Sequence, residues 1–517
     1  MLVDGGEIAL VDVREELIFS QSHLLLARSV PLSRFELNFA RLVPRRTTRI
    51  VLCDDDDGLA GRGAAILSRS GYDDVRILAG GTAAWAAAGF ELFSGVNVPS
   101  KAFGEYIEHA DGTPSIAADE LESLLRANAD LVVLDSRPFD EYVRVSIPTA
   151  TNVPGAELVL RAREMAPSPQ TMVVVNCAGR TRSIIGAQSL INARLPNKVI
   201  ALRNGTMGWS LAGFACDNGK NRRAPAVSPP TLVWAQAAAR RVALDCGVKP
   251  IDRRTLDSWR ADGKRTLYLF DVRDPAEYEA GHMPGAISAP GGQLVQATDQ
   301  YVGTLGARIV LIDDAEVRAA MTGSWLRQMG WTDVYSFAGR GTATGAPPPQ
   351  ILAADRRPDA AIECAGLGRL LSDKAATVVD LSLSRNYLAG HIPGAWFAIR
   401  TRLAQALTKI PLAGTVVLTS EDGVLASLAV DEASALTDLP VRHLAGGNAA
   451  WQAAGGSLSA EAKMADDAVD QWRKPYERSG DTKAAMAEYL AWETDLLPRI
   501  ERDGTVKFFH LGTSLSA

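Results

Sequence analysis

Short apolar runs rich in β-branched residues alternate with longer stretches whose apolar positions recur at helical spacing. The first clear example is the run at residues 50–52, followed by an alanine-rich amphipathic stretch at 59–70 and a second apolar run at 75–78. Runs of this length favour buried strands, and the stretches between them favour helices that cover a sheet. Because strand–helix–strand alternation builds parallel sheets, the chain is predicted to be α/β, with helices on both faces of each mainly parallel sheet.

The pattern repeats along the chain. A short glycine-containing segment that leads into tryptophan occurs at Trp85, Trp209 and Trp451, and a degenerate copy at 337–341 lacks the tryptophan. A strand ending in Asp-x-Arg opens each repeat, with Ser in place of Arg in the last: Asp12–Arg14, Asp135–Arg137, Asp271–Arg273 and Asp380–Ser382. Repetition of this size indicates tandem units, each a supersecondary assembly of its own.

Four units and a tail follow from these repeats. We expect unit 1 at residues 1–98, unit 2 at 113–220, unit 3 at 247–345, unit 4 at 358–459 and a partly helical C-terminal tail at 460–517. Connections bearing Pro and Gly near 95–113, 222–230 and 345–358 are expected to separate the units.

Cys177 follows the apolar run 173–175 and Asn176 of unit 2, and it begins a loop that leads through Ser183 into a helical pattern. The loop consists of Ala178, Gly179, Arg180, Thr181 and Arg182. This order predicts a thiol at the end of a strand, where backbone N–H groups and a helix N-terminus converge near two guanidinium groups. Such surroundings stabilise a thiolate, and they would also hold an anionic substrate or sulfur adduct.

Composition restricts the partners and cofactors that we expect. The 517 residues carry a net charge of −6, with 47% hydrophobic and 22% charged residues, which is typical of globular protein and gives no reason to expect nucleic acid or a membrane as partner. Five scattered cysteines, without CxxC, predict neither a disulfide framework nor a metal site, and no cofactor is expected. The N-terminus lacks a basic segment followed by an apolar one, so we expect a cytoplasmic location.

Four motifs in one order resemble rhodanese-like sulfurtransferase domains: the Asp-x-Arg strand, the Gly-His-x-Pro-Gly-Ala turn at 281–286 and 390–395, the loop after Cys177 and the Gly/Trp segment. The resemblance covers about residues 1–459 as four tandem modules, and it is to the bacterial multidomain type in which most modules have lost the nucleophile. Members normally carry a further helix before the first strand, so we expect the native start to lie upstream of Met1.

When the four loops are aligned on the small residue of the following helix, only one of them has a thiol at the nucleophile position. Ala187 lies ten positions after Cys177, and Ala64 lies ten positions after Asp54, which puts Asp54 and not Cys53 at the nucleophile position of unit 1. Unit 3 has Asp313 there and unit 4 has Ser420. Only unit 2 is therefore expected to be active. Asp135 and Arg137 have counterparts in units without a thiol, so we interpret them as a structural ion pair.

The resemblance implies transfer of sulfane sulfur from thiosulfate, or a related anion such as 3-mercaptopyruvate or a glutathione persulfide, through a Cys177 persulfide. The acceptor would be cyanide, a small thiol or a protein thiol. N–H groups from Ala178 to Ser183 are expected to stabilise the persulfide, Arg180 and Arg182 to bind the donor, and Thr181 and Ser183 to add hydroxyl donors. We also expect units 1 and 2 to pack together, with unit 1 walling the Cys177 pocket.

Two alternatives stay open. Cysteine phosphatases and arsenate-type oxyanion enzymes share this loop architecture, but the phosphatases place Arg six positions after Cys, whereas Arg182 lies five after Cys177. The shorter loop favours attack at sulfur. Alternatively, three modules without a thiol fit a non-enzymatic scaffold or a redox-regulated binding protein.

Overall fold

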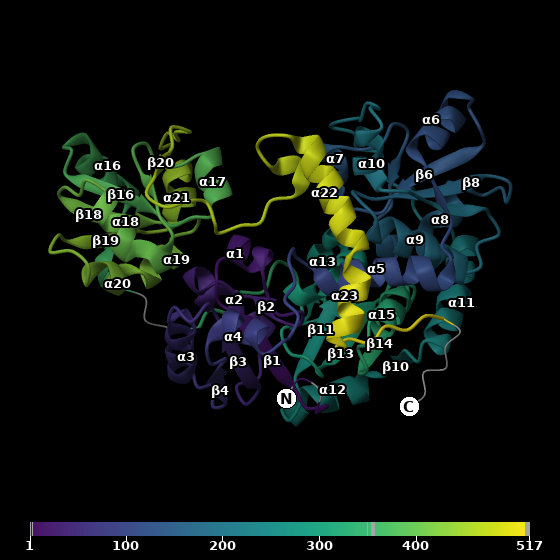
Figure 1. Ribbon diagram of the computed structural model, residues 1–517, viewed down its shortest axis with the longest axis horizontal. Helices are drawn as coiled ribbons and strands as arrows, with labels where there is room; N and C mark the ends of the chain where they lie inside the picture. The colour runs from purple at the N-terminus through teal and green to yellow at the C-terminus, as the bar shows by residue number, and fades with distance from the viewer. Residues whose placement is uncertain (1, 3, 349, 353–356, 512–517) are drawn as a thin grey trace.

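Four parallel sheets form the architecture, as the sequence predicts. The computed structural model describes residues 2, 4–348, 350–352 and 357–511. Within this part of the chain, the strands of every sheet pair in parallel, and helices flank the sheets (Figure 1). The predicted fold class, including a helical C-terminal tail, is confirmed.

Unit 2 contains a five-stranded sheet of order β5-β9-β8-β6-β7. Its strands are β5 (Ser115–Ile116), β6 (Leu131–Asp135), β7 (Thr151–Asn152), β8 (Met172–Asn176) and β9 (Val199–Leu202). Its helices are α6 (Ala118–Arg126), α7 (Phe139–Arg144), α8 (Leu158–Met165), α9 (Thr181–Asn192) and α10 (Gly205–Leu211). Successive strand residues point to opposite faces, so Val173 and Val175 pack with α8 and α9, and Val174 packs with α6 and α10.

The other units repeat this plan. Unit 1 has β1 (Ile8–Asp12), β2 (Arg28–Ser29), β3 (Arg49–Cys53) and β4 (Val75–Ile77), with α1 (Glu16–Gln21), α2 (Phe35–Leu42), α3 (Leu59–Arg69) and α4 (Gly81–Ala87). Unit 3 has β10 (Lys249–Pro250), β11 (Leu267–Asp271), β12 (Ile287–Ser288), β13 (Arg308–Asp313) and β14 (Val334–Ala338), with α12 (Arg253–Asp262), α13 (Pro275–Ala280), α14 (Gly291–Gln296) and α15 (Arg318–Gln328).

Unit 4 carries one additional strand. Its strands are β15 (Ala361–Ile362), β16 (Ala376–Asp380), β17 (Trp396–Phe397), β18 (Thr415–Thr419) and β19 (Val441–Leu444), and β20 (Lys463–Met464) of the tail joins the edge strand β17. Its helices are α16 (Cys364–Ser372), α17 (Ser384–Ala389), α18 (Leu403–Lys409), α19 (Val424–Leu428), α20 (Val430–Ser434) and α21 (Gly447–Ala453).

Two of the predicted connections lead into helices. The segment 95–113 contains α5 (Val98–Asp111), and 222–230 leads into α11 (Pro229–Asp245). Proline stands in the first turn of both helices, where its fixed φ is favourable and its missing N–H costs no hydrogen bond. The prolines that indicated breaks in the sequence therefore mark helix starts.

Unit 2 packs chiefly against unit 3 and not against unit 1 as expected, although Glu16, Val96 and Asn97 of unit 1 do line the Cys177 pocket. A guanidinium–carboxylate contact joins Arg318 to Glu157 at 2.9 Å, and the indole N–H of Trp325 donates to Ser189 Oγ at 2.9 Å. Residues of α8, α9, α11 and α15 share one buried apolar cluster. Figure 1 shows units 2 and 4 at opposite sides of the molecule, with units 1 and 3 between them.

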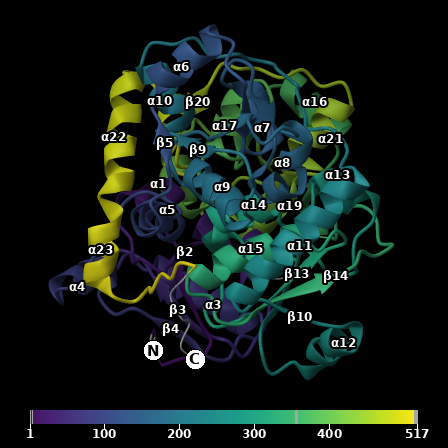
Figure 2. The ribbon, with the colours of Figure 1, turned by 90° about the vertical axis from the view of Figure 1, so that its right-hand side faces the viewer.

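The C-terminal tail crosses the other units. After β20 it passes α1, where the N–H of Leu17 donates to the carbonyl of Val469 (3.0 Å), and then forms α22 (Thr482–Thr494) and α23 (Leu496–Asp503). Figure 2 shows these two helices along one side of the molecule, next to α10 and α5, which they contact. None of the helices in the described part of the chain has the length and apolar character needed to cross a bilayer.

Candidate active site

Cys177 is the first residue after β8, the central strand of unit 2. Its side chain is 2% exposed, yet it lines a cavity of about 310 Å³ together with Ala178 and Gly179. The thiol donates to Ser183 Oγ at 3.5 Å, and Ser183 Oγ itself donates to the carbonyl of Arg180 at 2.7 Å. The thiol therefore faces a polar cavity at the carboxyl end of a parallel sheet, where ligands commonly bind in such folds.

The loop after Cys177 presents free backbone donors. Within the described residues, no protein acceptor takes a hydrogen bond from the N–H groups of Ala178, Gly179, Arg180, Thr181 or Arg182. The N–H of Ser183 donates to the carbonyl of Arg180 at 3.1 Å, so this group, which the sequence analysis included in the cradle, is already bonded. Successive unpaired N–H groups at the start of α9 form a ready site for an anion.

Strand register identifies the matching position in each unit. In each unit, the aspartate of the Asp-x-Arg strand (Asp-x-Ser in unit 4) pairs in register with one residue of the neighbouring strand. In chain order these partners are Cys53, Asn176, Ile312 and Thr419. The next residue along each of these central strands is, in chain order, Asp54, Cys177, Asp313 or Ser420. These four residues stand at one place in the repeated fold.

In units 1 and 3 a carboxylate at this place accepts the loop N–H groups. Asp54 accepts from the N–H of Asp56 at 3.0 Å and from that of Ala60 at 2.8 Å. Asp313 accepts from the N–H groups of Ala315, Val317, Arg318 and Ala319 at 2.7–3.3 Å. An internal anion thus occupies the cradle in both units, whereas in unit 2 the cradle N–H groups have no protein acceptor among the described residues.

Arg182 lies five residues after Cys177 and lines the cavity. Its guanidinium contacts Glu141 of α7 at 2.8 Å, and Lys474 of the tail contacts the same carboxylate at 3.1 Å. Burial opposes ionisation of Glu141, but the charges of Arg182 and Lys474 outweigh it and hold the pKa of this carboxyl below its ordinary value. Glu141 therefore fixes the orientation of Arg182 at the cavity wall.

Arg180 is directed elsewhere. Its guanidinium donates to both oxygens of Glu105 at 2.7 Å, to Glu108, and to Asn204 Oδ1 at 3.2 Å. It is not among the residues that line the cavity. Because these contacts engage its donors, Arg180 joins the loop to α5, and its geometry counts against the expected role in donor binding.

Thr181 also points away from the cavity. Its hydroxyl is fully buried and donates to Glu493 Oε1 of α22 at 3.3 Å, and Lys101 Nζ of α5 contacts the same oxygen at 2.7 Å. Burial by itself lowers the pKa of Lys101, but Glu493 and Tyr489 outweigh it and raise that pKa, so this lysine stays charged. Of the two predicted hydroxyl donors, only Ser183 lies beside the thiol.

Elements that the sequence analysis did not assign to the site complete the cavity. They include Asn97 and Lys101 at the start of α5, Gln293 and Gln296 of α14, and Gln471, Trp472, Lys474, Tyr476 and Tyr489 of the tail. These positions are far from Cys177 in sequence and carry no local motif. Unit 1, with the bounds predicted from the sequence, contributes Glu16, Val96 and Asn97.

Asp135 and Arg137 form a buried pair at 2.6 Å, and Arg137 also donates to the carbonyl of Val145. Unit 3 repeats this geometry with Asp271 and Arg273. The pair thus ties a strand end to the turn that follows, as interpreted from the sequence. Among the described residues, no group of three or more His, Cys, Asp or Glu side chains is arranged to hold a metal ion.

Comparison with known proteins identifies the class. The model of the rhodanese-like domain family matches residues 1–88, 117–212, 253–340 and 365–454. The chain belongs to the rhodanese-like family and contains four such domains, as the motifs predicted.

One solved structure resembles the whole chain. It is described as a thiosulfate sulfurtransferase from Pseudomonas aeruginosa, is 48% identical, and superposes with a TM-score of 0.96 over 99% of this chain and 98% of its own. Two curated relatives match over shorter stretches: the uncharacterized protein YqhL of Bacillus subtilis (34% identity over 85 residues) and the HTH-type transcriptional regulator Rv0324 of Mycobacterium tuberculosis (32% over 109 residues). The matches span 65% and 47% of those two proteins, and 16% and 21% of this chain.

Proposed function

We propose that this protein is a thiosulfate sulfurtransferase in which unit 2 performs the reaction and Cys177 carries the sulfur. The observation that supports this most directly is the contrast between cradles: the Cys177 loop offers unpaired N–H groups to an outside anion, while Asp54 and Asp313 accept them in their own units. The likeness to the Pseudomonas aeruginosa protein over nearly the whole chain supports the same donor.

The first step is loading. The Cys177 thiolate attacks the outer sulfur of thiosulfate, the bond between the two sulfurs of the donor breaks, and its electron pair leaves with sulfite. The terminal sulfur of the resulting persulfide lies in the cradle, where N–H groups oriented toward its negative charge stabilise it without reorganisation. Arg182 at the cavity wall binds the sulfonate oxygens of the donor, because a guanidinium can donate to two oxygens at once.

The second step is discharge. A nucleophilic acceptor attacks the outer sulfur of the persulfide, and the electron pair of the broken S–S bond returns to Cys177 as a thiolate. This two-step scheme predicts ping-pong kinetics. Units 1, 3 and 4 have no thiol at the corresponding place, so they serve as structure.

Intact-mass measurement after incubation with thiosulfate tests the proposal. We expect a gain of one sulfur atom with stoichiometric release of sulfite, removal of that sulfur by cyanide, and no gain in Cys177→Ser. Hydrolysis of an aryl phosphate by the same preparation would instead support phosphatase chemistry. If the protein is folded but shows neither of these activities, that result would support the scaffold role.

A further inference from the structure

Lys101 differs from the other cations of the Cys177 cavity in where its counter-ion lies. Every basic side chain that lines this cavity contacts a carboxylate at 2.5–3.1 Å: Lys101, Arg144, Arg182, Arg385 and Lys474. The partners of the last four are Glu141 and Glu477, and both of these carboxylates line the cavity themselves. Glu493, the partner of Lys101, is fully buried and is not a lining residue. Within the described part of the chain, Lys101 is therefore the one cation that faces this cavity without its counter-ion.

The ammonium group of Lys101 keeps a donor for a ligand. Its Nζ contacts Glu493 Oε1 at 2.7 Å and lies 5.4 Å from the centre of the Tyr489 ring. Because an ammonium carries three N–H donors, one remains even if Glu493 and the Tyr489 hydroxyl each accept one. Lys101 also stands near the N-terminus of α5, where the helix dipole adds positive potential. These features favour an anion at this wall of the cavity.

Glu493 connects Lys101 to the loop after Cys177. Its Oε1 accepts from the hydroxyl of Thr181 at 3.3 Å as well as from Lys101. Its Oε2 is buried, has no hydrogen-bond partner within the described residues and lies against Gly179, where a Cβ would come within 3.0 Å of it. One carboxylate thus contacts both the cation and the loop that carries the unpaired N–H groups.

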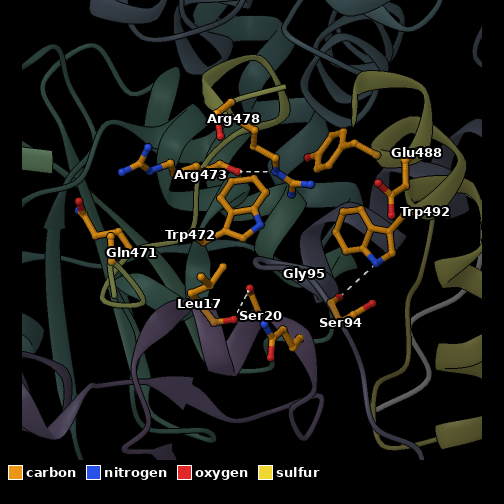
Figure 3. A pocket seen from close by; sticks show the side chains of 14 residues that line it. Leu17, Ser20, Ser94, Gly95, Gln471, Trp472, Arg473, Arg478, Glu488 and Trp492 are labelled. Atoms are coloured by element: carbon orange, nitrogen blue, oxygen red, sulfur yellow. Dashed lines mark hydrogen bonds between the residues drawn. The ribbon is translucent and has the colours of Figure 1, made fainter. Parts of the chain in front are cut away.

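The packing of α22 holds Glu493 in place. Apolar residues of this helix and of unit 2 form one buried cluster beside the loop: Ala178, Met207, Met486 and Leu490. Trp492 borders a neighbouring cavity of about 530 Å³, where its indole N–H donates to the carbonyl of Ser94 at 3.1 Å (Figure 3). A side chain at Gly95 would clash with this indole. Because Trp492 directly precedes Glu493, this contact also fixes the position of Glu493.

We propose that Lys101 is a donor-binding residue of the Cys177 site and that Glu493 of the tail is its positioning residue. Lys101 of α5 and Arg182 of α9 together hold the sulfonate oxygens of thiosulfate through charged hydrogen bonds. Glu493 keeps the lysine oriented and charged without placing a negative charge in the cavity. The inference rests on the proposed function, because it adds two residues to the donor site of that reaction.

The groups around Lys101 determine its response to pH. Burial lowers the pKa of Lys101, and the charge of Glu493, with Tyr489, outweighs burial and raises that pKa. Glu105, one turn further along α5, is bound by Arg180. The other charged side chains that line the cavity are Glu16, Asp140, Glu141, Arg144, Arg182, Arg385, Lys474 and Glu477. Loss of the Glu493 charge should therefore leave burial as the main influence and lower the pKa of Lys101.

Steady-state sulfite release by the full-length protein at neutral pH tests the role of Lys101. The double variant Lys101→Met/Glu493→Gln removes the pair without leaving a buried charge. Its KM for thiosulfate should rise about 10- to 100-fold, as for loss of one charged hydrogen bond, with kcat within about twofold. The matched control is Lys409→Met/Asp466→Asn, a lysine–carboxylate pair of unit 4 that does not line the cavity. An unchanged KM in the first variant, or an equal rise in the control, would overturn the assignment.

The pH profile of Glu493→Gln is a second readout, which a purely structural role would not move. The amide oxygen can still accept from Thr181, but it does not offset the burial of Lys101. The ratio of its KM to that of the unaltered protein should therefore increase from about pH 7 to about pH 10, as Lys101 loses its proton. Lys101→Arg/Glu493→Gln should abolish this increase, because arginine stays charged. A ratio independent of pH in Glu493→Gln would exclude Glu493 as the positioning residue.

Thiosulfate binding to the Cys177→Ser protein separates this inference from the proposed function. This variant cannot form a persulfide, so calorimetry measures binding alone. We expect binding that weakens about 10- to 100-fold when Lys101→Met/Glu493→Gln is added. Binding that these changes do not affect would overturn the inference and leave the sulfur transfer intact. If binding depends on Lys101 but no donor ever loads Cys177, the anion site stands and the proposed sulfur transfer fails.

Discussion

The loops of units 2 and 3 differ in how they treat the unpaired N–H groups at the start of the helix that follows. Both follow the central strand of a parallel sheet, and both open a helix whose first N–H groups lack helical partners. Unit 3 satisfies these groups with Asp313, which is fully buried. Unit 2 places Cys177 there, and the N–H groups of residues 178–182 have no protein acceptor in the described part of the chain. Unit 3 thus gains internal stability, whereas unit 2 keeps unpaired N–H groups, to which we assign the binding of an external anion in the proposed function.

The arginines sharpen this comparison. Arg318 and Arg182 each lie five residues after the central position, and each contacts a glutamate four residues after the Asp-x-Arg arginine, Glu277 or Glu141. In unit 3 the guanidinium also contacts Asp313 at 2.9 Å. The corresponding guanidinium in unit 2 contacts Glu141 but has no carboxylate at the central position, so the place beside the thiol is open to the donor anion of the proposed reaction.

Cys177→Asp should convert the loop of unit 2 into that of unit 3. We expect sulfur loading to fall by at least about a thousandfold, because a carboxylate cannot accept sulfane sulfur and would occupy the cradle. The melting temperature should stay equal or rise, as the new carboxylate accepts the loop N–H groups and contacts Arg182. Intact mass and calorimetry measure both effects. A variant that still loads sulfur would remove Cys177 from the mechanism.

Asp313→Ala should show the reverse pattern. Removing the carboxylate leaves the Arg318 guanidinium and four loop N–H groups without this partner, so we expect a stability loss of roughly 3–5 kcal/mol. Cys177→Ala, the matched change in unit 2, should cost about 1 kcal/mol or less, since no strong hydrogen bond is lost. Urea titrations followed by two probes measure the difference. Equal losses in the two variants would contradict the proposed division of roles.

The sequence predicted the fold well because its signals are local. Apolar runs and amphipathic stretches identified four parallel sheets, and the residue ten positions before a small helical residue identified Asp54 as the counterpart of Cys177. The helix α5 was missed because Pro99 resembles a chain break, although proline is favourable in a first helical turn. Side-chain direction was also inaccessible: Arg180 and Arg182 are two residues apart, yet Glu105 on α5 and Glu141 on α7 orient them differently.

The walls of the site could not be predicted for a different reason. Lys474 and Tyr489 reach the Cys177 cavity from a tail about three hundred residues further along the chain. Contacts of this kind depend on how units pack, which periodicity within one unit does not encode. The packing of unit 2 on unit 3, set by contacts such as that of Arg318 with Glu157, was beyond sequence patterns for the same reason.

Arg182→Gln and Arg180→Gln should separate the two loop arginines. The first removes a charged donor from the cavity wall, so kcat/KM for thiosulfate should fall about 10- to 100-fold, mainly through KM. The second removes a link to α5 and should leave kcat/KM within about twofold, since no interaction with the donor is lost. Steady-state sulfite release measures both, and melting temperatures control for folding. A larger fall in kcat/KM for Arg180→Gln than for Arg182→Gln would mean that Arg180 does bind the donor.

Asp54→Ala tests whether Asp54 stabilises the unit 1 loop less than Asp313 stabilises the unit 3 loop. Asp54 is buried and accepts two N–H groups, but Leu59 stands where unit 3 has Arg318, so no guanidinium loses its partner. We therefore expect a stability loss of roughly 1–2 kcal/mol, as for removal of a helix-capping carboxylate, with unchanged sulfur loading at Cys177. Asp54→Asn should recover part of the loss, because one amide oxygen can still accept from the loop. If Asp54→Ala proved as damaging as Asp313→Ala, the N–H groups rather than the buried arginine would dominate the stability of both loops.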